Sequence, residues 1–126
     1  MSRSSLVHLR PSIETSDTST TTPIEQFQNS VLRPVIKFQH DWFVTWGNSL
    51  PNWKMICSFS GKKEDFLARV SDYFSKQQDK KGMIIGAVVG LMSSEELEFY
   101  FDNEKELNKR IIQMVVQRMT DTFYVA

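Results

Sequence analysis

His40 and Asp41 are the residues whose types and spacing come closest to an acid–base pair. They are adjacent in "KFQHDWF", and a histidine beside a carboxylate can accept and donate protons near neutral pH. The sequence places no second histidine, reactive-serine motif or Glu-x-x-His pattern near them. We therefore interpret His40 as a surface histidine on a helix and predict no catalytic residue, so the sequence leans away from an enzyme.

Metal-binding and thiol chemistry are not favoured either. Carboxylate oxygens can bind a metal, and three glutamates are close together in the sequence: Glu95, Glu96 and Glu98. They fall in the first turn of a predicted helix, where capping and the helix dipole already explain acidic residues. Cys57 is the single cysteine, which excludes an intramolecular disulfide and a zinc site built on several thiolates. We expect an inert, partly buried thiol, a reducing cytoplasmic compartment, and no metal or cofactor.

An aromatic cluster is the best candidate for a ligand or partner site. Aromatic side chains gather around the predicted turn "GNSLPNW", at 47–53. At such density they either close the end of a core or form an exposed adhesive surface. Core is the favoured interpretation. If Trp46 and Trp53 are instead exposed, the candidate site consists of His40, Asp41, Trp42, Trp46 and Trp53.

Charge and hydropathy limit the classes of partner. Fifteen basic residues balance fifteen acidic ones, so no net field attracts nucleic acid. The longest apolar run is far shorter than the about 20 residues of a membrane-spanning helix. We predict a protein partner, with a symmetric homodimer as one form, and neither nucleic acid binding nor a transmembrane segment.

The stretch "KKGMIIGAVVGLMSSEE", at 80–96, contains three glycines four residues apart. It lacks both the dinucleotide fingerprint and the Walker spacing of a phosphate loop. As a helix it is apolar on every side, which predicts a central, buried helix. Gly86 and Gly90 share one ridge, and each costs roughly 0.8–1 kcal/mol relative to alanine. We predict that they permit close packing of a neighbouring helix. A buried strand is the alternative.

Capping signals and apolar stripes predict the elements that carry these residues. Thr22 and Glu25 form the start of the first helix, and Pro34 predicts a kink or two helices in series. Residues 53–60 alternate as a strand would, but also suit a short helix. The predicted helices are 23–47, 62–77, the Gly-rich stretch that follows Asp79, the short helix "EELEFYF" at 95–101, and a final helix that ends at about 122. Their predicted caps are Asp79, Ser93 with Glu96, and Asn103 with Glu106.

These elements predict an all-α, single-domain bundle of about five helices with a buried Gly-rich central helix. The alternative is an α+β fold with a small sheet. Residues 1–22 are rich in Ser and Thr and poor in apolar side chains, so we predict a disordered tail followed by the helical bundle domain at 23–126.

Three stretches together resemble a family of small, uncharacterised bacterial proteins found mainly in Bacteroidetes. They are "TPIEQFQNSVLRPVIKFQHD", "GAVVGLMSSEELEFYF" and "NEKELNKRIIQMVVQRM". The resemblance implies a helical fold and no particular activity. Some members carry the label glyoxalase, but glyoxalase I proteins hold a metal with His and Glu residues from separate strands, and this sequence has neither the strands nor the ligands.

The favoured function is therefore a small soluble helical protein that acts as a protein-interaction or structural module. One alternative is a small enzyme or ligand carrier with a pocket near His40 and the tryptophans. Another is a peripheral membrane protein anchored by exposed Trp46 and Trp53.

Overall fold

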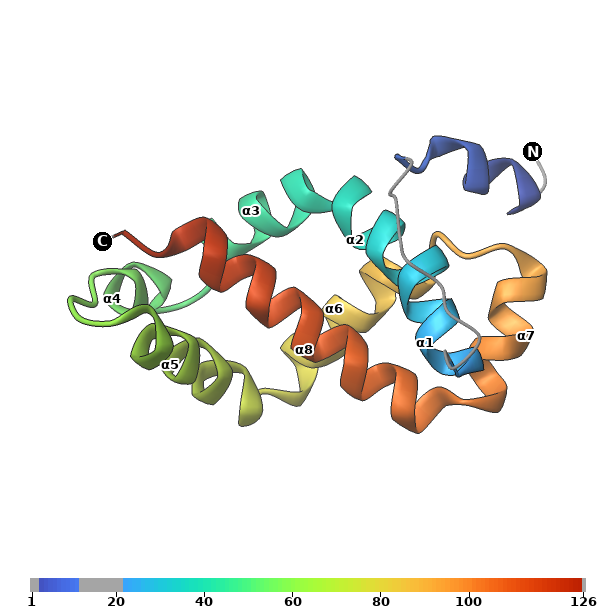
Figure 1. Ribbon diagram of the computed structural model, residues 1–126. Helices are drawn as coiled ribbons and strands as arrows, with labels where there is room; N and C mark the ends of the chain where they lie inside the picture. The colour runs from blue at the N-terminus through green and yellow to red at the C-terminus, as the bar shows by residue number, and fades with distance from the viewer. Residues whose placement is uncertain (1–2, 12–21, 126) are drawn as a thin grey trace.

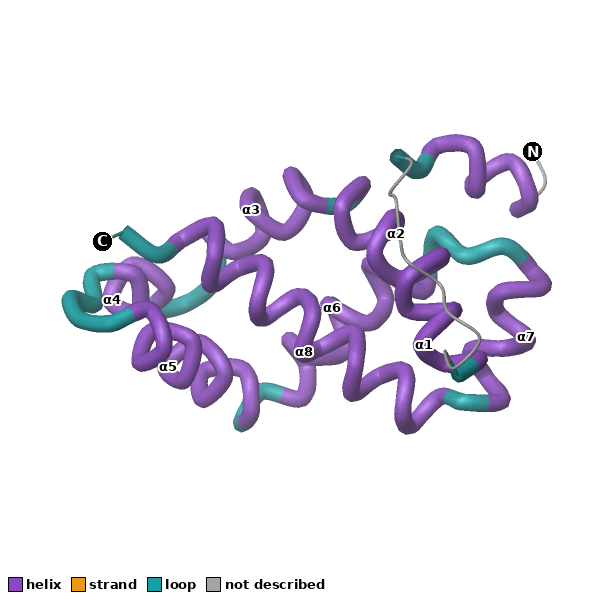
Figure 2. The backbone as a smooth tube through the Cα atoms, viewed as in Figure 1, coloured by secondary structure: helices purple, strands orange, loops and turns teal. Residues whose placement is uncertain are grey.

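The computed structural model describes residues 3–11 and 22–125, and every regular element in these ranges is a helix (Figures 1 and 2). The predicted all-α bundle is confirmed, and the α+β alternative is wrong. The elements are the 3-10 helix η1 (Arg3–Leu9), α1 (Pro23–Phe27), the π-helical η2 (Gln28–Leu32), α2 (Arg33–Phe38), α3 (His40–Asn48), α4 (Trp53–Cys57), α5 (Lys63–Ser75), α6 (Gln78–Val89), α7 (Ser94–Asp102) and α8 (Glu104–Phe123).

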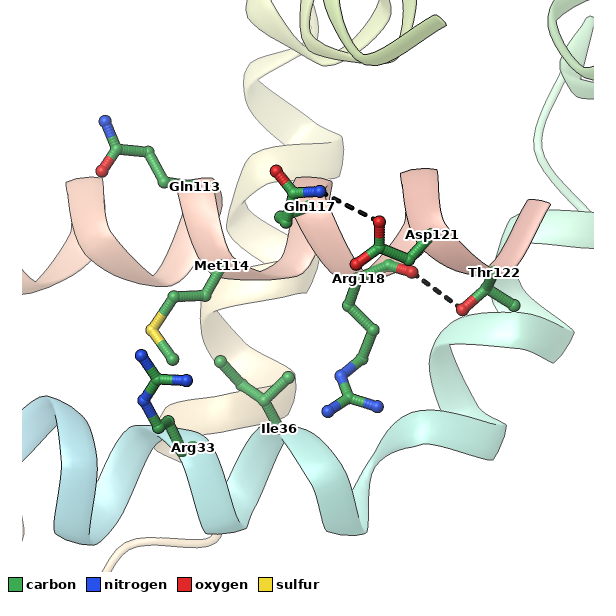
Figure 3. A pocket seen from close by; sticks show the side chains of 8 residues that line it. All are labelled: Arg33, Ile36, Gln113, Met114, Gln117, Arg118, Asp121 and Thr122. Atoms are coloured by element: carbon green, nitrogen blue, oxygen red, sulfur yellow. Dashed lines mark hydrogen bonds between the residues drawn. The ribbon is translucent and has the colours of Figure 1, made fainter. Parts of the chain in front are cut away.

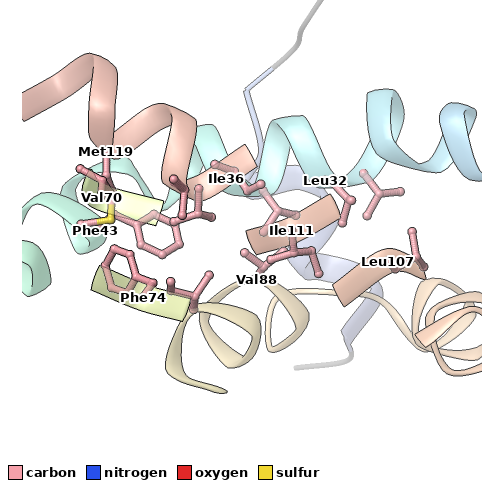
Figure 4. Packing of buried hydrophobic residues seen from close by; sticks show 14 of the residues in the cluster. Leu32, Ile36, Phe43, Val70, Phe74, Val88, Leu107, Ile111 and Met119 are labelled. Atoms are coloured by element: carbon pink, nitrogen blue, oxygen red, sulfur yellow. The ribbon is translucent and has the colours of Figure 1, made fainter. Parts of the chain in front are cut away.

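Helix α8 lies at the centre of the bundle (Figure 1). Its side chains at four-residue intervals, Leu107, Ile111, Val115 and Met119, are at most 1% exposed. This stripe packs against η2, α3, α5, α6 and α7, as part of the core shown in Figure 4. Because isolated helices are marginal in water, the burial of this face is what makes α8 stable.

The first helical segment is interrupted where the sequence predicted it. The N–H of Arg33 donates to the carbonyl of Gln28, five residues back, which makes η2 a π-helical turn directly before Pro34. A π-turn widens the helix and accommodates a residue that cannot donate to the ladder. A second break falls at Gln39 (φ −86°, ψ 10°), whose side-chain amide donates to the Ala87 carbonyl at 2.9 Å and ties this segment to α6.

Helix α6 is helical as expected, but it is buried on one face only. Ile84 and Val88 are fully buried, whereas Gly86 lies at the surface. A Cβ at Gly86 would meet nothing within 4 Å, and one at Gly90 would meet only the Gly86 carbonyl oxygen. The predicted close packing at Gly86 and Gly90 is therefore wrong. Glycines beside apolar residues imitate an all-round apolar helix in sequence, yet here they form its solvent side.

The capping predictions have mixed outcomes. The box at Ser93 and Glu96 is present in both directions, with N···O distances of 3.2 and 2.8 Å. Thr22 caps α1 by accepting from the Glu25 N–H at 3.1 Å. Asn103 forms no box, because its side-chain amide donates to the Phe99 carbonyl instead. The residue before α6 is Gln77 and makes no side-chain cap, so the Asp79 prediction is also wrong.

Residues Arg3–Leu9, which we predicted to be disordered, form the 3-10 helix η1 against the connection between α6 and α7. Arg3 donates to the carbonyls of Gly90 and Met92 at 2.7 and 2.8 Å. Arg10 donates to the Leu91 carbonyl and makes a bidentate ion pair with Glu96, at 2.6 and 2.7 Å. The two arginines thus supply hydrogen-bond donors to carbonyl oxygens of the connection that follows α6. Residues 12–21 of the predicted tail lie outside the described ranges.

We expect Gly86→Ala to raise the free energy of unfolding by about 0.8–1 kcal/mol, because the methyl group meets open space and alanine is the better helix former. The matched control is Gly61→Ala, which should destabilise the protein because Gly61 has φ +149° and Phe59 lies 2.9 Å from the new Cβ. Urea denaturation measures both. A destabilising Gly86→Ala would restore the close-packing interpretation.

Glu96→Gln should lower stability at neutral pH and have little effect in acid. Burial alone would raise the pKa of Glu96, but hydrogen bonds from Arg10 and from the Ser93 N–H, with the charge of Arg10, lower it overall. The stabilisation is therefore complete above the ordinary glutamate pKa of about 4.3 and is lost as pH falls through the lower folded value. Unfolding measured from pH 7 to pH 3 should show the two proteins converge; a constant gap would contradict this.

Candidate functional site

The tryptophans predicted as a ligand or partner site close one end of the core. Trp53 is 2% exposed and packs edge-on against Phe123. Trp42 stacks on Trp46 with ring centroids 5.4 Å apart, and Trp46 stacks in turn on Phe74. Trp42 and Trp46 are half-buried against the core. The core interpretation is confirmed for Trp53, which is too buried to serve as a membrane anchor.

The larger of the two grooves described here lies elsewhere, between α2 and α8 (Figure 3). The two helices run in the same direction, and the groove between them has a volume of about 500 Å³. The residues from α8 recur at spacings of three and four, so they form one edge of that helix. The lining consists of Arg33, Ile36, Gln113, Met114, Gln117, Arg118, Asp121 and Thr122.

Two arginines, Arg33 and Arg118, contribute positive charge to the lining of this groove. Arg33 donates from Nε to the Asn29 side-chain oxygen at 3.0 Å, and Arg118 lies with Nη1 3.3 Å from His40 Nδ1. Within the described ranges neither guanidinium has a carboxylate within 4.0 Å. Arginine stays charged at any pH that a folded protein experiences. The groove therefore holds two positive charges with N–H donors free to meet a ligand.

His40 contacts the groove through Arg118 but does not line it. Because the guanidinium always donates, His40 Nδ1 must accept in this contact, which places the ring proton on Nε2. Asp41 is exposed, and no hydrogen bond joins it to His40 in the described part of the chain. The structure therefore makes His40 a neighbour of Arg118, and the acid–base pair that the adjacent residues His40 and Asp41 could have formed is not assembled among the described residues.

Asp121 is the one carboxylate among the lining residues. Its Oδ1 accepts from Lys63 Nζ at 2.7 Å and from the Gln117 side-chain amide at 3.0 Å. The hydrogen bond from Lys63, aided by Gln117 and by the charges of Lys63 and Arg118, lowers the pKa of Asp121. Asp121 is therefore ionised at neutral pH and is a poor proton donor. The Thr122 hydroxyl donates to the Arg118 carbonyl and is likewise engaged.

A second groove of about 400 Å³ lies on the other side of α8, against α5 and α6. It is more apolar than the first, and Lys81 contributes the only charged side chain to its lining. Gln113 and Gln117 line both grooves, so this ridge of α8 separates them. The remaining lining residues are Leu67, Ser71, Phe74, Ser75, Ile112 and Val116.

Comparison of the chain with protein-family models, curated proteins and solved structures found no match. In the described ranges no three His, Cys, Asp or Glu side chains come together as a metal site. Those ranges also hold no helix with the length and apolar character needed to cross a bilayer.

Reasoning from sequence missed the groove residues, although one signal was available. Arg118 falls within the predicted apolar stripe of the last helix, three residues after the buried Val115 and directly before the buried Met119. A charged residue on such a stripe lies at the edge of the core, where grooves form. Arg33 gave no such signal, because its role depends on the π-turn that orients α2.

Replacing Asp121 by Asn should change the free energy of unfolding by less than about 1 kcal/mol, because its ion pair with Lys63 is half-exposed. Lys63→Met is the matched control and should have a similarly small effect. Urea denaturation of both variants checks this. A loss of several kcal/mol for Asp121→Asn alone would mean that the carboxylate stabilises the groove itself.

Proposed function

We propose that this protein binds a small anionic molecule in the groove between α2 and α8. The observation that supports this function most strongly is that Arg33 and Arg118 line one groove without carboxylate partners in the described part of the chain. Charge-assisted hydrogen bonds to an anion contribute about 1.5–3 kcal/mol each, more than neutral hydrogen bonds.

The shape and lining of the groove favour a small molecule. Ligand pockets commonly have volumes of about 300–1,000 Å³ and combine apolar walls with a few polar groups. This groove has a volume of about 500 Å³, with Ile36 and Met114 as apolar walls and the Gln113 and Gln117 amides at its edge. The predicted alternative of a ligand carrier with a pocket near His40 is the closest to this proposal.

The polar side chains that line the groove favour binding over catalysis, because the carboxylate and the hydroxyl group among them are already engaged within the protein. Asp121 is ionised and held by Lys63, and the Thr122 hydroxyl is used within α8. A general acid or base needs a pKa near the working pH, and a nucleophile needs an activating base. The lining residues supply neither, so we assign the groove to recognition.

Protein interaction is a second candidate function. Three large apolar side chains, Met55, Phe101 and Val125, are 61–78% exposed. Met55 lies on α4, Phe101 on α7, and Val125 follows the end of α8. A partner that covers one of these side chains would remove its apolar surface from water. A homodimer remains the simplest form of this proposal.

We also propose a reducing, cytoplasmic location, because the single thiol, Cys57, is partly buried and burial raises its pKa, which disfavours the reactive thiolate. The resemblance to a bacterial family agrees with this location and stays a prediction.

Substitution of either groove arginine should weaken anion binding. We expect sulfate and acetate to stabilise the wild-type protein against heat, and Arg33→Met and Arg118→Met to reduce the affinity about tenfold each, as the loss of about 1.4 kcal/mol implies. The matched control is Lys109→Met, which removes one positive charge from an exposed position of α8 outside the groove. Equal weakening in all three variants would show that the anions respond to net charge alone, and equal responses in all four proteins would show that the groove arginines do not bind them.

A further inference from the structure

The two arginines enter the α2–α8 groove from different helices, Arg33 from α2 and Arg118 from α8. Figure 3 shows the Arg33 guanidinium beside Met114 and the Arg118 guanidinium on the other side of Ile36, so that Ile36 lies between the two guanidinium groups. Ile36 is 2% exposed and forms the floor. The groove thus places one guanidinium on each side of the apolar Ile36. The Asp121 carboxylate, which is paired with Lys63, lines the same groove three residues beyond Arg118.

Helix geometry sets the scale of this arrangement. Met114 and Arg118 are four residues apart on α8, a rise of about 6 Å along the helix axis. Arg33 and Ile36 are nearly one turn apart on α2, and the two helices run in the same direction. The two guanidinium groups come from different helices, and the Ile36 side chain lies between them in Figure 3.

Each guanidinium is also held in place from outside the groove. Asn29 accepts from Arg33 Nε, and His40 Nδ1 lies within hydrogen-bond distance of Arg118 Nη1. Each contact occupies one N–H of its arginine and restricts the rotation of a long side chain, and within residues 3–11 and 22–125 the other guanidinium N–H groups have no hydrogen-bond partner. Two donors fixed at two ends favour a ligand that reaches both.

We propose that the ligand is an elongated molecule with an acidic group at each end and an apolar segment between them, of the aliphatic dicarboxylate class. One carboxylate accepts hydrogen bonds from Arg33 and the other from Arg118. The methylene chain lies over Ile36 and against Met114. This inference rests on the proposed function, because it names the chemical class of the ligand at that site.

The test is calorimetric titration of the full chain with straight-chain dicarboxylates of increasing length, from succinate to sebacate. Monocarboxylates of matching length and sulfate are the comparison ligands. We expect affinity to pass through a maximum with length, and the best dicarboxylate to bind at least about tenfold more tightly than its monocarboxylate. Arg33→Met and Arg118→Met should each reduce that ligand to monocarboxylate affinity, whereas Lys109→Met should keep the preference. Circular dichroism confirms that each variant is folded.

The outcomes separate this inference from the proposed function. If monocarboxylates and sulfate bind as tightly as every dicarboxylate, and binding still requires the arginines, the site is an anion site and the two-ended ligand is wrong. If no ligand of the series binds to the folded wild-type protein, both proposals are overturned. A length optimum that persists in Arg33→Met would also contradict the two-ended ligand, because only one guanidinium would then be needed.

Discussion

Burial of one face of α8 is the constraint on which the rest of the structure depends. Leu107, Ile111, Val115 and Met119 are fully buried, and burial of each such side chain contributes about 1.5–3 kcal/mol. Five other elements pack on this face. Because the buried stripe fixes the rotation of α8 about its axis, it also fixes which residues reach the edge. That edge carries Gln113, Gln117 and Arg118 into the groove with α2.

The arginines of the described ranges fall into two groups by what they contact. Most are used within the fold: Arg10 pairs with Glu96, and Arg110 contacts Glu106 and Gln28. Arg3 caps carbonyls after α6, and Arg69 lies over the Phe59 ring. Arg33 and Arg118 line the same groove. Their side-chain partners, Asn29 and His40, are not carboxylates. Asp121 is the one carboxylate among the lining residues and is paired with Lys63, so the two guanidinium groups leave this groove with an excess of positive charge that favours binding of an anion.

The sequence predicted the helices well because their signals are local. The stripe of α8, the Ser93–Glu96 box and the interruption at Pro34 each depend on residues within one or two turns. The packing of α6 could not be predicted, since apolar content does not reveal which side of a short helix faces its neighbours. The η1 contacts join residues more than 80 positions apart. The groove joins α2 to α8 and depends on their relative placement, which periodicity does not give.

Amide chemical-shift mapping during titration with a dicarboxylate tests most directly whether the α2–α8 groove is the binding site. The account predicts saturable shifts confined to α2 and the second half of α8, including the side-chain amides of Gln113 and Gln117. Shifts spread over exposed lysines such as Lys76 and Lys109, or confined to the neighbourhood of the tryptophans, would contradict it.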